Sequence, residues 1–458
     1  MKNFSSTLLY ASAGVCVLFG LQANNAQAGN DFFDVNGTTA GTGVTSGASY
    51  SWEDPNWATA SGGTTATGAW TPGSFAEFTT ALPYTVTLSA DESVAGFFAT
   101  VSGETLNLNA TGSGTLDLPT STTVVAGVGT VQGFLGHSSS TVNINAPISG
   151  SGGVEPENGG SINLLGNNTY TGGTLLASSS TLVGFNNNNS FSTGAIGIQL
   201  TSGSFAPLLS SGGAAITLGN NFVNLASGGG VNFASAANTP VISTGTWSLG
   251  ANNLNLRNNG PGTAQLTLSG SISGSANLTL SGANGDKIKL SGANTYSGVT
   301  TIGSASATAI TLVLGAANTI ASSSGIVLTG PTATLNLGGF SHSMGATTLT
   351  LSSGGIIDFG AGATTTSFAN SSSLTWTGTL DLINYNSAVD TLQFGVDTTG
   401  LTSAQLAEIE VNGTGLGAAT INSAGDIVFT PEPSAASVGL LGAALAGALS
   451  LIRRRRTS

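Results

Sequence analysis

The feature of this sequence that most constrains its fold is a short alternation of apolar residues with Thr, Ser or Asn, which returns from about Val94 to Phe429. Each run is about four to six residues long and is closed by Gly, Ser-Gly or Asn, as in Thr105–Leu108, Thr141–Ile144 and Thr334–Leu337. An apolar period of two with turn residues at its ends predicts half-buried β-strands. Since only 6% of the residues are charged, coiled coils and charge-rich disorder are disfavoured. The sequence therefore predicts an all-β protein.

A longer repeat is superimposed on this alternation. The segment Leu165–Thr174 returns as Ser291–Thr300, and Ile148–Gly152 returns as Ile272–Ser275. The two offsets, 126 and 124 residues, are nearly equal. Such offsets indicate a duplicated block with small insertions and deletions at its turns. Tyr170 and Tyr296, which match in this alignment, should therefore occupy equivalent places in the folded chain.

Strands of this kind need neighbours, because each presents one apolar face that it cannot bury alone. Stacking successive coils of about 20 to 25 residues buries these faces in one continuous core, which predicts a β-solenoid. The alternative is a set of β-sandwich domains, which would favour longer strands and distinct linkers. The sequence contains no linker of that kind.

The unit Leu-x-Gly-x-Asn-Thr-Tyr-x-Gly-x-Thr begins at Leu164 and again at Leu290. It resembles the autotransporter-associated β-strand repeat. The match is most specific at Asn-Thr-Tyr and the following Gly, and it covers two clear copies. The resemblance implies a right-handed parallel β-helix.

The N-terminal segment, residues 1–28, has the pattern of a signal peptide. Lys2 is followed by an apolar region from about Leu8 to Leu21, and Ala26-Gln27-Ala28 is a cleavage site of the A-x-A type. We expect cleavage after Ala28, with Ala26 and Ala28 as its recognition residues. An uncleaved membrane anchor is the alternative, but the apolar region is short for a bilayer span. Cys16, the one cysteine, lies in this segment, so no disulfide framework is expected.

The C-terminal segment, residues 431–458, has three parts in a fixed order. The motif Pro431-Glu432-Pro433 precedes an uncharged apolar stretch, Ala435–Ile452, and the basic tail Arg453, Arg454, Arg455 and Arg456 follows. A stretch of this length can cross a bilayer as a transmembrane helix, and the arginines would hold its end in the cytoplasm. A plain C-terminal anchor is the alternative, but it would need no such motif.

This arrangement resembles the PEP-CTERM sorting signal. The resemblance implies an exosortase-type membrane protease and the export machinery as partners. It also implies export, a transient inner-membrane anchor, and release to the cell surface or the extracellular matrix.

Two further segments differ from the repeats. Residues 29–100 are rich in aromatic residues and look like an N-terminal cap, with Trp52, Trp57 and Trp70 as its tryptophans. An aromatic platform for carbohydrate is the alternative. Residues 375–430 are expected to form a C-terminal cap region with one helix, which Thr402 would cap. The repeats between them, residues 101–374, are expected to form the solenoid.

The charged residues exclude several functions. Acids outnumber bases 20 to 8, and between the two ends only Arg257, Lys287 and Lys289 are cationic. Such a chain cannot neutralise a row of phosphates, so no nucleic-acid partner is expected. The segment Asp286–Lys289 is expected to be a solvated turn. His137 and His342, the two histidines, are far apart in the sequence and are expected at the surface.

Two functions remain. The first is a non-enzymatic surface or extracellular-matrix protein with a structural or adhesive role, for which extracellular polysaccharide is a candidate partner. The second is a carbohydrate-active β-helix enzyme, a polysaccharide hydrolase or lyase, which would need clustered carboxylates beside a base or cation. The acids are scattered singly along the sequence, and no catalytic residue, metal site or cofactor is expected. A cluster of three carboxylates on one face would favour the enzyme.

Overall fold

The computed structural model describes most of the chain between residues 29 and 429. The positions left out of this range are 81, 100–102, 122, 137–139, 158, 212–213, 236–239, 260–264, 283–284, 304–308, 321 and 414–417. The predicted signal peptide with Ala26 and Ala28 lies outside the described residues. So do His137 and the sorting segment with Pro431, Glu432, Pro433 and Arg453–Arg456. None of the helices in the described part of the chain is long and apolar enough to span a membrane.

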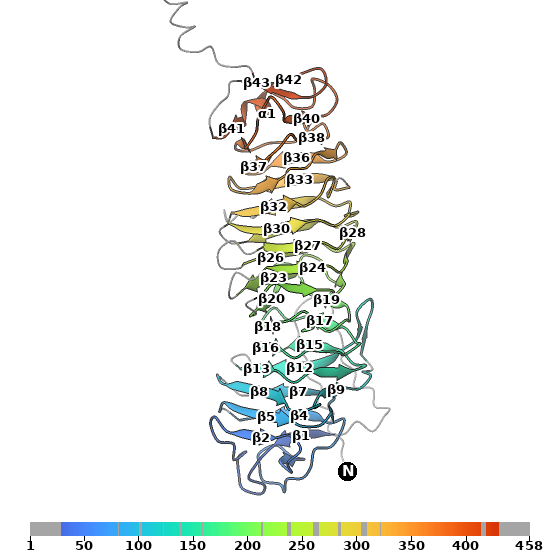
Figure 1. Cartoon of the computed structure of the whole chain (residues 1–458), viewed down its shortest axis with the longest axis vertical. Coiled ribbons are helices and arrows are strands. Elements are labelled where there is room, and N and C mark those ends of the chain that lie inside the picture. Colours follow the sequence, from blue (N-terminus) through green and yellow to red (C-terminus); the bar gives the residue numbers. More distant parts are fainter. Residues whose placement is uncertain are drawn as a thin grey trace, which may run out of the picture. The chain divides into compact units, whose positions relative to one another are not determined.

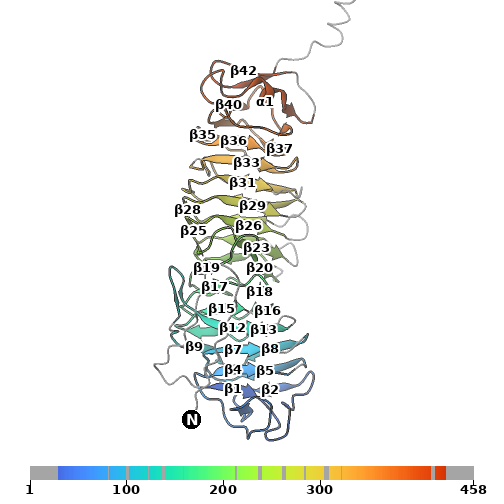
Figure 2. The same cartoon turned by 180° about the vertical axis from the view of Figure 1, so that it is seen from behind.

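The regular secondary structure of the described residues is almost entirely β-strand, as predicted, and these residues divide into two units. The first contains the described residues up to Leu209 together with Phe222–Val231, and the second contains Ser210–Asn221 and the residues from Asn232 onward. The strand β23 (Gly230–Ser235) runs through one boundary between them. Within each unit the strands stack coil upon coil (Figures 1 and 2).

Parallel strands make up the main sheets of the first unit. One sheet consists of β1 (Asn30–Phe33), β4 (Phe75–Phe78), β7 (Gly96–Ala99), β12 (Gln132–Gly136), β15 (Val154–Glu157), β17 (Thr174–Leu176), β19 (Ile196–Ile198) and β22 (Phe222–Asn224), with β3 (Trp57–Ala58) antiparallel to β1. A second consists of β2 (Ser49–Ser51), β5 (Tyr84–Leu88), β8 (Thr105–Ala110), β13 (Thr141–Ile144), β16 (Gly160–Leu164), β18 (Thr181–Phe185) and β20 (Phe205–Ser210). A third consists of β6 (Glu92–Ser93), β9 (Leu116–Leu118) and β14 (Ile148–Gly150), and β10 (Val124–Val125) pairs with β11 (Gly129–Thr130) as a separate hairpin.

The second unit repeats this construction. One sheet consists of β21 (Ile216–Leu218), β24 (Val241–Ser243), β27 (Gln265–Leu268), β30 (Asp286–Leu290), β32 (Ile310–Leu314), β34 (Thr334–Asn336), β37 (Gly355–Asp358), β39 (Leu380–Ile383) and β41 (Ile409–Val411). Another contains β26 (Leu254–Asn258), β29 (Leu278–Gly282), β31 (Thr300–Gly303), β33 (Gly325–Thr329) and β36 (Thr348–Leu351). Shorter ladders pair β25 (Trp247–Gly250) with β28 (Ile272–Gly274), and β38 (Thr365–Phe368) with β35 (His342–Met344) and β40 (Thr391–Phe394). The helix α1 (Ser403–Ala407) and the hairpin β42 (Ala419–Ile421) and β43 (Ile427–Phe429) come last.

The core consists of columns of equivalent apolar residues from successive coils. In the second unit Leu256 pairs with Leu280, Leu280 with Ile302, and Ile302 with Leu328, and all four side chains are buried. These partners lie 24, 22 and 26 residues apart, close to the predicted coil length. Since the strands of a β-sandwich are antiparallel, this parallel pairing confirms the solenoid and excludes the sandwich.

The repeated Asn-Thr-Tyr motif has the same role in both units. Tyr170 is buried and its hydroxyl lies 2.6 Å from Thr174 Oγ1, and Tyr296 is buried with its hydroxyl 2.7 Å from Thr300 Oγ1. The predicted equivalence of the two tyrosines is confirmed. The asparagine two residues earlier is also buried in each copy.

This buried asparagine ties neighbouring coils together. Asn168 Oδ1 accepts a hydrogen bond from the Ile148 backbone N–H at 2.8 Å, and its Nδ2 donates to the Ser190 carbonyl at 2.6 Å. In the second copy Asn294 makes the same two bonds, with Ile272 N and Thr319 O. The motif is therefore a clamp across three successive coils.

Two local predictions in the second unit had different outcomes. The helix is confirmed as α1, and Thr402 caps it in a capping box with Gln405. The turn predicted at Asp286–Lys289 is wrong, because these residues lie in β30, within a parallel sheet, and Asp286 is fully buried, whereas Lys287 is exposed and Lys289 half-buried on the solvated face. The alternation Asp286, Ile288, Leu290 places all three residues on the inner face.

Candidate functional site

The tryptophans of residues 29–100 form a closed cluster in the first unit. Trp52, Trp57 and Trp70 are 1%, 2% and 7% exposed, and their ring centroids lie between 4.6 and 5.1 Å apart. The indole N–H of Trp57 donates to the Trp52 carbonyl, and that of Trp70 donates to the Ser93 carbonyl. A sugar ring can stack only on an exposed aromatic face. This burial therefore argues against the carbohydrate platform.

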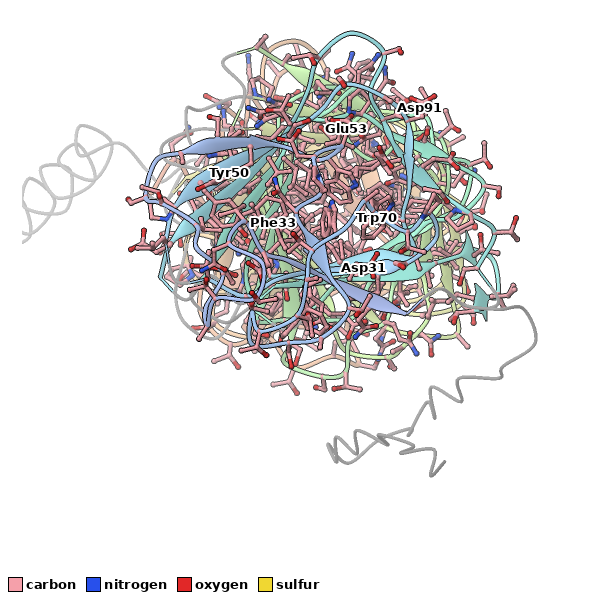
Figure 3. The ribbon with its side chains drawn as sticks, turned by 90° about the horizontal axis from the view of Figure 1, so that it is seen from below. Asp31, Phe33, Tyr50, Glu53, Trp70 and Asp91 are labelled. Atoms are coloured by element: carbon pink, nitrogen blue, oxygen red, sulfur yellow. The ribbon has the colours of Figure 1, made fainter. Side chains whose placement is uncertain are left out.

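An acidic cluster lies beside these tryptophans. Figure 3 shows Glu53 and Asp91 on the same side of the first unit, with Trp70 nearer its centre. The pKa of Glu92 is raised to about 6. Partial burial is the largest cause, and the negative charges of Glu53 and Asp91 add to it. The expectation that the acids are scattered is wrong here, because the fold brings Glu53 close to Asp91 and Glu92 from a distant part of the sequence.

The Glu53 carboxylate has a structural role in this cluster. Its Oε1 accepts the backbone N–H groups of Ser89 and Ala90 at 2.5 and 2.9 Å, and its Oε2 accepts the Ser51 hydroxyl at 2.6 Å. Partial burial would raise the pKa of Glu53, but these three hydrogen bonds outweigh it, so the pKa lies below its ordinary value. Oε1 therefore anchors the turn between β5 and β6, and Oε2 is held by Ser51 at the end of β2.

The chemistry of this cluster is limited by its surroundings. One carboxyl group with a raised pKa beside one with a lowered pKa is the pattern of an acid and base pair. However, the first unit contains no lysine or arginine among the residues that the structure describes, so no cation there can stabilise developing negative charge. The cluster could transfer protons, but its base is already bound by three donors.

A second carboxyl pair lies on β15. Glu155 and Glu157 are hydrogen-bonded to each other through their side chains, and Glu155 is only 4% exposed. Burial raises the pKa of Glu155 to about 8, with further contributions from the charge and the hydrogen bond of Glu157. Burial also raises the pKa of Glu157. Two carboxyl groups in direct contact leave no space between them for a scissile bond, so this pair does not have the geometry of a glycosidase.

The prediction that His342 lies at the surface is wrong. It is 1% exposed, its Nδ1 accepts the Asn318 backbone N–H at 3.1 Å, and its Nε2 lies 3.0 Å from the Leu337 carbonyl. An imidazole that accepts at Nδ1 and donates at Nε2 is neutral. Burial lowers its pKa, although the bond to Leu337 opposes this shift. Both ring nitrogens therefore bond the backbone. The ring, at the start of β35, links this strand to Asn318 and to Leu337.

No metal centre emerges from these groups. Within the described ranges, no three His, Cys, Asp or Glu side chains converge so that they could hold a metal ion. The candidate groups are thus the two carboxyl clusters of the first unit, neither of which the sequence revealed. The i, i+2 spacing of Glu155 and Glu157 was visible, but its burial was not.

Comparison with known proteins adds no relative. No protein-family model matches the chain, and neither a curated protein nor a solved structure does.

Proposed function

We propose that this chain is an exported, non-enzymatic protein of the cell surface or extracellular matrix, with a structural or adhesive role. The observation that carries the proposal is that the polar residues of the repeated motif are buried and bond neighbouring coils. Its conspicuous polar residues, Asn168 and Tyr170 in one copy and Asn294 and Tyr296 in the other, hold neighbouring coils together in the interior. A repeat built in this way favours stiffness and resistance to proteolysis.

The proposed architecture extends this picture. The coils would wind as a right-handed β-helix, with residues 29–100 and 375–430 protecting its ends from edge-to-edge association. The buried tryptophan cluster supports the first of these caps. The transmembrane helix would be Ala435–Ile452, and extracellular polysaccharide is the proposed partner at the cell surface.

Sorting would follow from the physical properties of the C-terminal segment. Ala435–Ile452 would halt in the bilayer, because moving Arg453–Arg456 across it is costly. Pro431 and Pro433 cannot donate backbone hydrogen bonds, so the motif would remain extended and accessible to an exosortase-type membrane protease. Glu432 would be the charged recognition residue. Cleavage would then release the chain from its transient inner-membrane anchor.

The test is the fractionation and mass of the tagged chain in a host that carries an exosortase. The wild type should lose about 25 C-terminal residues and reach the surface fraction. Replacing Pro431, Glu432 and Pro433 with alanine should leave export and anchoring intact but abolish release, whereas the control Ser434→Ala should be processed normally. Replacing Arg453–Arg456 with serine should weaken retention. A wild-type surface fraction that keeps its full mass would reject processing.

One observation favours the second candidate, a carbohydrate-active β-helix enzyme. Glu92, with its raised pKa, lies near the ionised Glu53. The released wild-type protein should nevertheless generate no new reducing ends from neutral polysaccharides. Reducing ends that appear with the wild type and disappear with Glu92→Gln would favour the enzyme over the structural protein.

A further inference from the structure

A hairpin in the first unit covers the outside of one sheet. Its strands β10 and β11 are joined by a turn in which the Val128 N–H donates to the Val125 carbonyl at 3.0 Å, and the Val131 N–H donates to the Thr123 carbonyl at 3.1 Å. The coil from Leu108 to its partner Ile144, which contains this hairpin, is 36 residues long, whereas the next coil, from Ile144 to Leu164, is 20 residues long. Its apolar side chains form a cluster of their own, outside the solenoid core.

The cluster is defined by close packing. Val128, Val131 and Leu175 are 6%, 1% and 3% exposed, and Val125, Ala177 and Leu225 pack against them. Leu175 in β17 and Ala177 just after it lie on the outward face of the sheet. An uncovered sheet would expose this face to solvent. The hairpin is therefore the cover that buries these positions.

Two glycines make room for the hairpin. A Cβ atom added to Gly173 would lie 2.2 Å from Val128 Cγ1, and one added to Gly197 would lie 2.5 Å from Val128 Cγ2. The backbone also contributes, since the Gly173 N–H donates to the Thr130 carbonyl at 3.2 Å and the Thr130 hydroxyl donates to the Ser151 carbonyl at 3.0 Å. The hairpin is thus seated by shape and by a few hydrogen bonds.

The carboxyl pair of β15 borders this cluster. Val154 pairs with Thr174, so the next residue on each strand, Glu155 and Leu175, lies on the opposite, outward face. Glu155 is buried although it points outward, so it lies within the covered area. A hydrogen bond between two carboxyl groups needs one proton. The hydrogen-bonded form of this pair therefore carries one proton.

We propose that the hairpin is a pH-dependent cover, seated while Glu155 and Glu157 share a proton and loosened when that proton is lost. Among the residues that the structure describes, no further titratable group lies on the elements that flank the pair. The hairpin segment 123–131, the strand β17 and the neighbouring strand β12, which places Gly133 beside Glu155, contain no titratable residue. Without the proton, two carboxylates would be held in contact in a water-poor site, and at least one would have to turn into solvent.

The direction and range of the effect follow from linkage. With the hairpin open, both glutamates regain an ordinary pKa near 4.5, whereas in the closed state the pKa of Glu155 is about 8. Between these values the closed state holds one more proton than the open state. Raising the pH from about 5 to 8 should therefore increase the opening equilibrium by about tenfold per pH unit, and the increase should stop above about pH 8.

Hydrogen exchange on the full exported chain tests this proposal. The amides to follow are those of Val128, Val131 and Gly173, after division by the base-catalysed intrinsic rate. In the wild type their protection should fall about tenfold per pH unit between pH 5 and 8 and then level off. In Glu155→Gln the pH dependence should be much weaker, because a Gln–Glu hydrogen bond needs no added proton and only Glu157 still titrates.

Two further variants keep the test decisive. Glu410→Gln alters a pair with Glu408 that has the same spacing, in which Glu410 is exposed and Glu408 half-buried, so it should keep the wild-type pH dependence. Gly197→Val should leave the hairpin unprotected at every pH, because its side chain would occupy the place of Val128. Amides of β8 in the core should remain protected throughout, which shows that the unit is folded. The proposal would be overturned if amide protection in the wild type did not change with pH, or if it fell equally steeply with pH in Glu155→Gln.

Discussion

The coil clamp allows a quantitative test, because the chain contains it twice. Replacing Asn168 with alanine removes the acceptor for the Ile148 N–H and the donor for the Ser190 carbonyl, at 2.8 and 2.6 Å. Asn168 is 3% exposed, so water can replace these partners only if the coils move apart. Each buried backbone group left unpaired costs about 1–3 kcal/mol. The free energy of unfolding should fall by about 2–6 kcal/mol.

The second copy supplies an independent replicate. Asn294→Ala should cost the same range in the second unit, because the bonds to Ile272 N and Thr319 O are equivalent at 2.8 and 3.0 Å. Tyr170→Phe removes only one hydroxyl bond, to Thr174, and should cost about 1 kcal/mol. Asn167 is exposed and is the matched control, for which alanine should cost less than about 0.5 kcal/mol.

The assay is urea unfolding followed by far-ultraviolet circular dichroism. A shift of the midpoint at an unchanged slope gives the change in stability. Since a solenoid can unfold unit by unit, hydrogen exchange should assign each loss to the unit that carries the substitution. If Asn168→Ala and Asn294→Ala both lie within the range of the Asn167 control, the asparagines do not clamp the coils and the reasoning fails.

Two further predictions concern single titratable groups. Burial lowers the pKa of His342, so below the ordinary value of 6.5 the unfolded chain binds more protons than the folded chain. The free energy of unfolding should therefore fall as the pH drops through this region. His342→Gln should make that fall smaller, as measured by urea unfolding at several pH values. Replacing Glu53 with Gln removes one of the charges that raise the pKa of Glu92, so the pKa of Glu92 should move from about 6 toward 4.5 in carbon-13 NMR titrations, and an unchanged value would show that the charge of Glu53 does not contribute.

Chemistry at the carboxyl clusters depends on distances that no local pattern contains. Glu53 meets Glu92 because β2 and β5 are neighbours in one sheet while β6 follows β5 directly. The two acids are 39 positions apart in the sequence, and no local pattern predicts their contact. His342 and Asp286 were misjudged for the same reason: the polar residues around them suggested solvent, while the register of the sheets placed them inside.

The sequence by itself determined the class of fold, the coil length and the equivalence of Tyr170 with Tyr296. These follow from side-chain alternation along a strand and from a repeat distance, both of which are local properties of the chain. Only the tertiary structure decided that Asn168 clamps three coils and that the hairpin at Val124–Thr130 covers β17 and β19. The physical reason is that burial of an outward face depends on what packs over it. A valine in a glycine-rich loop has the same local pattern whether it lies in solvent or against Gly197.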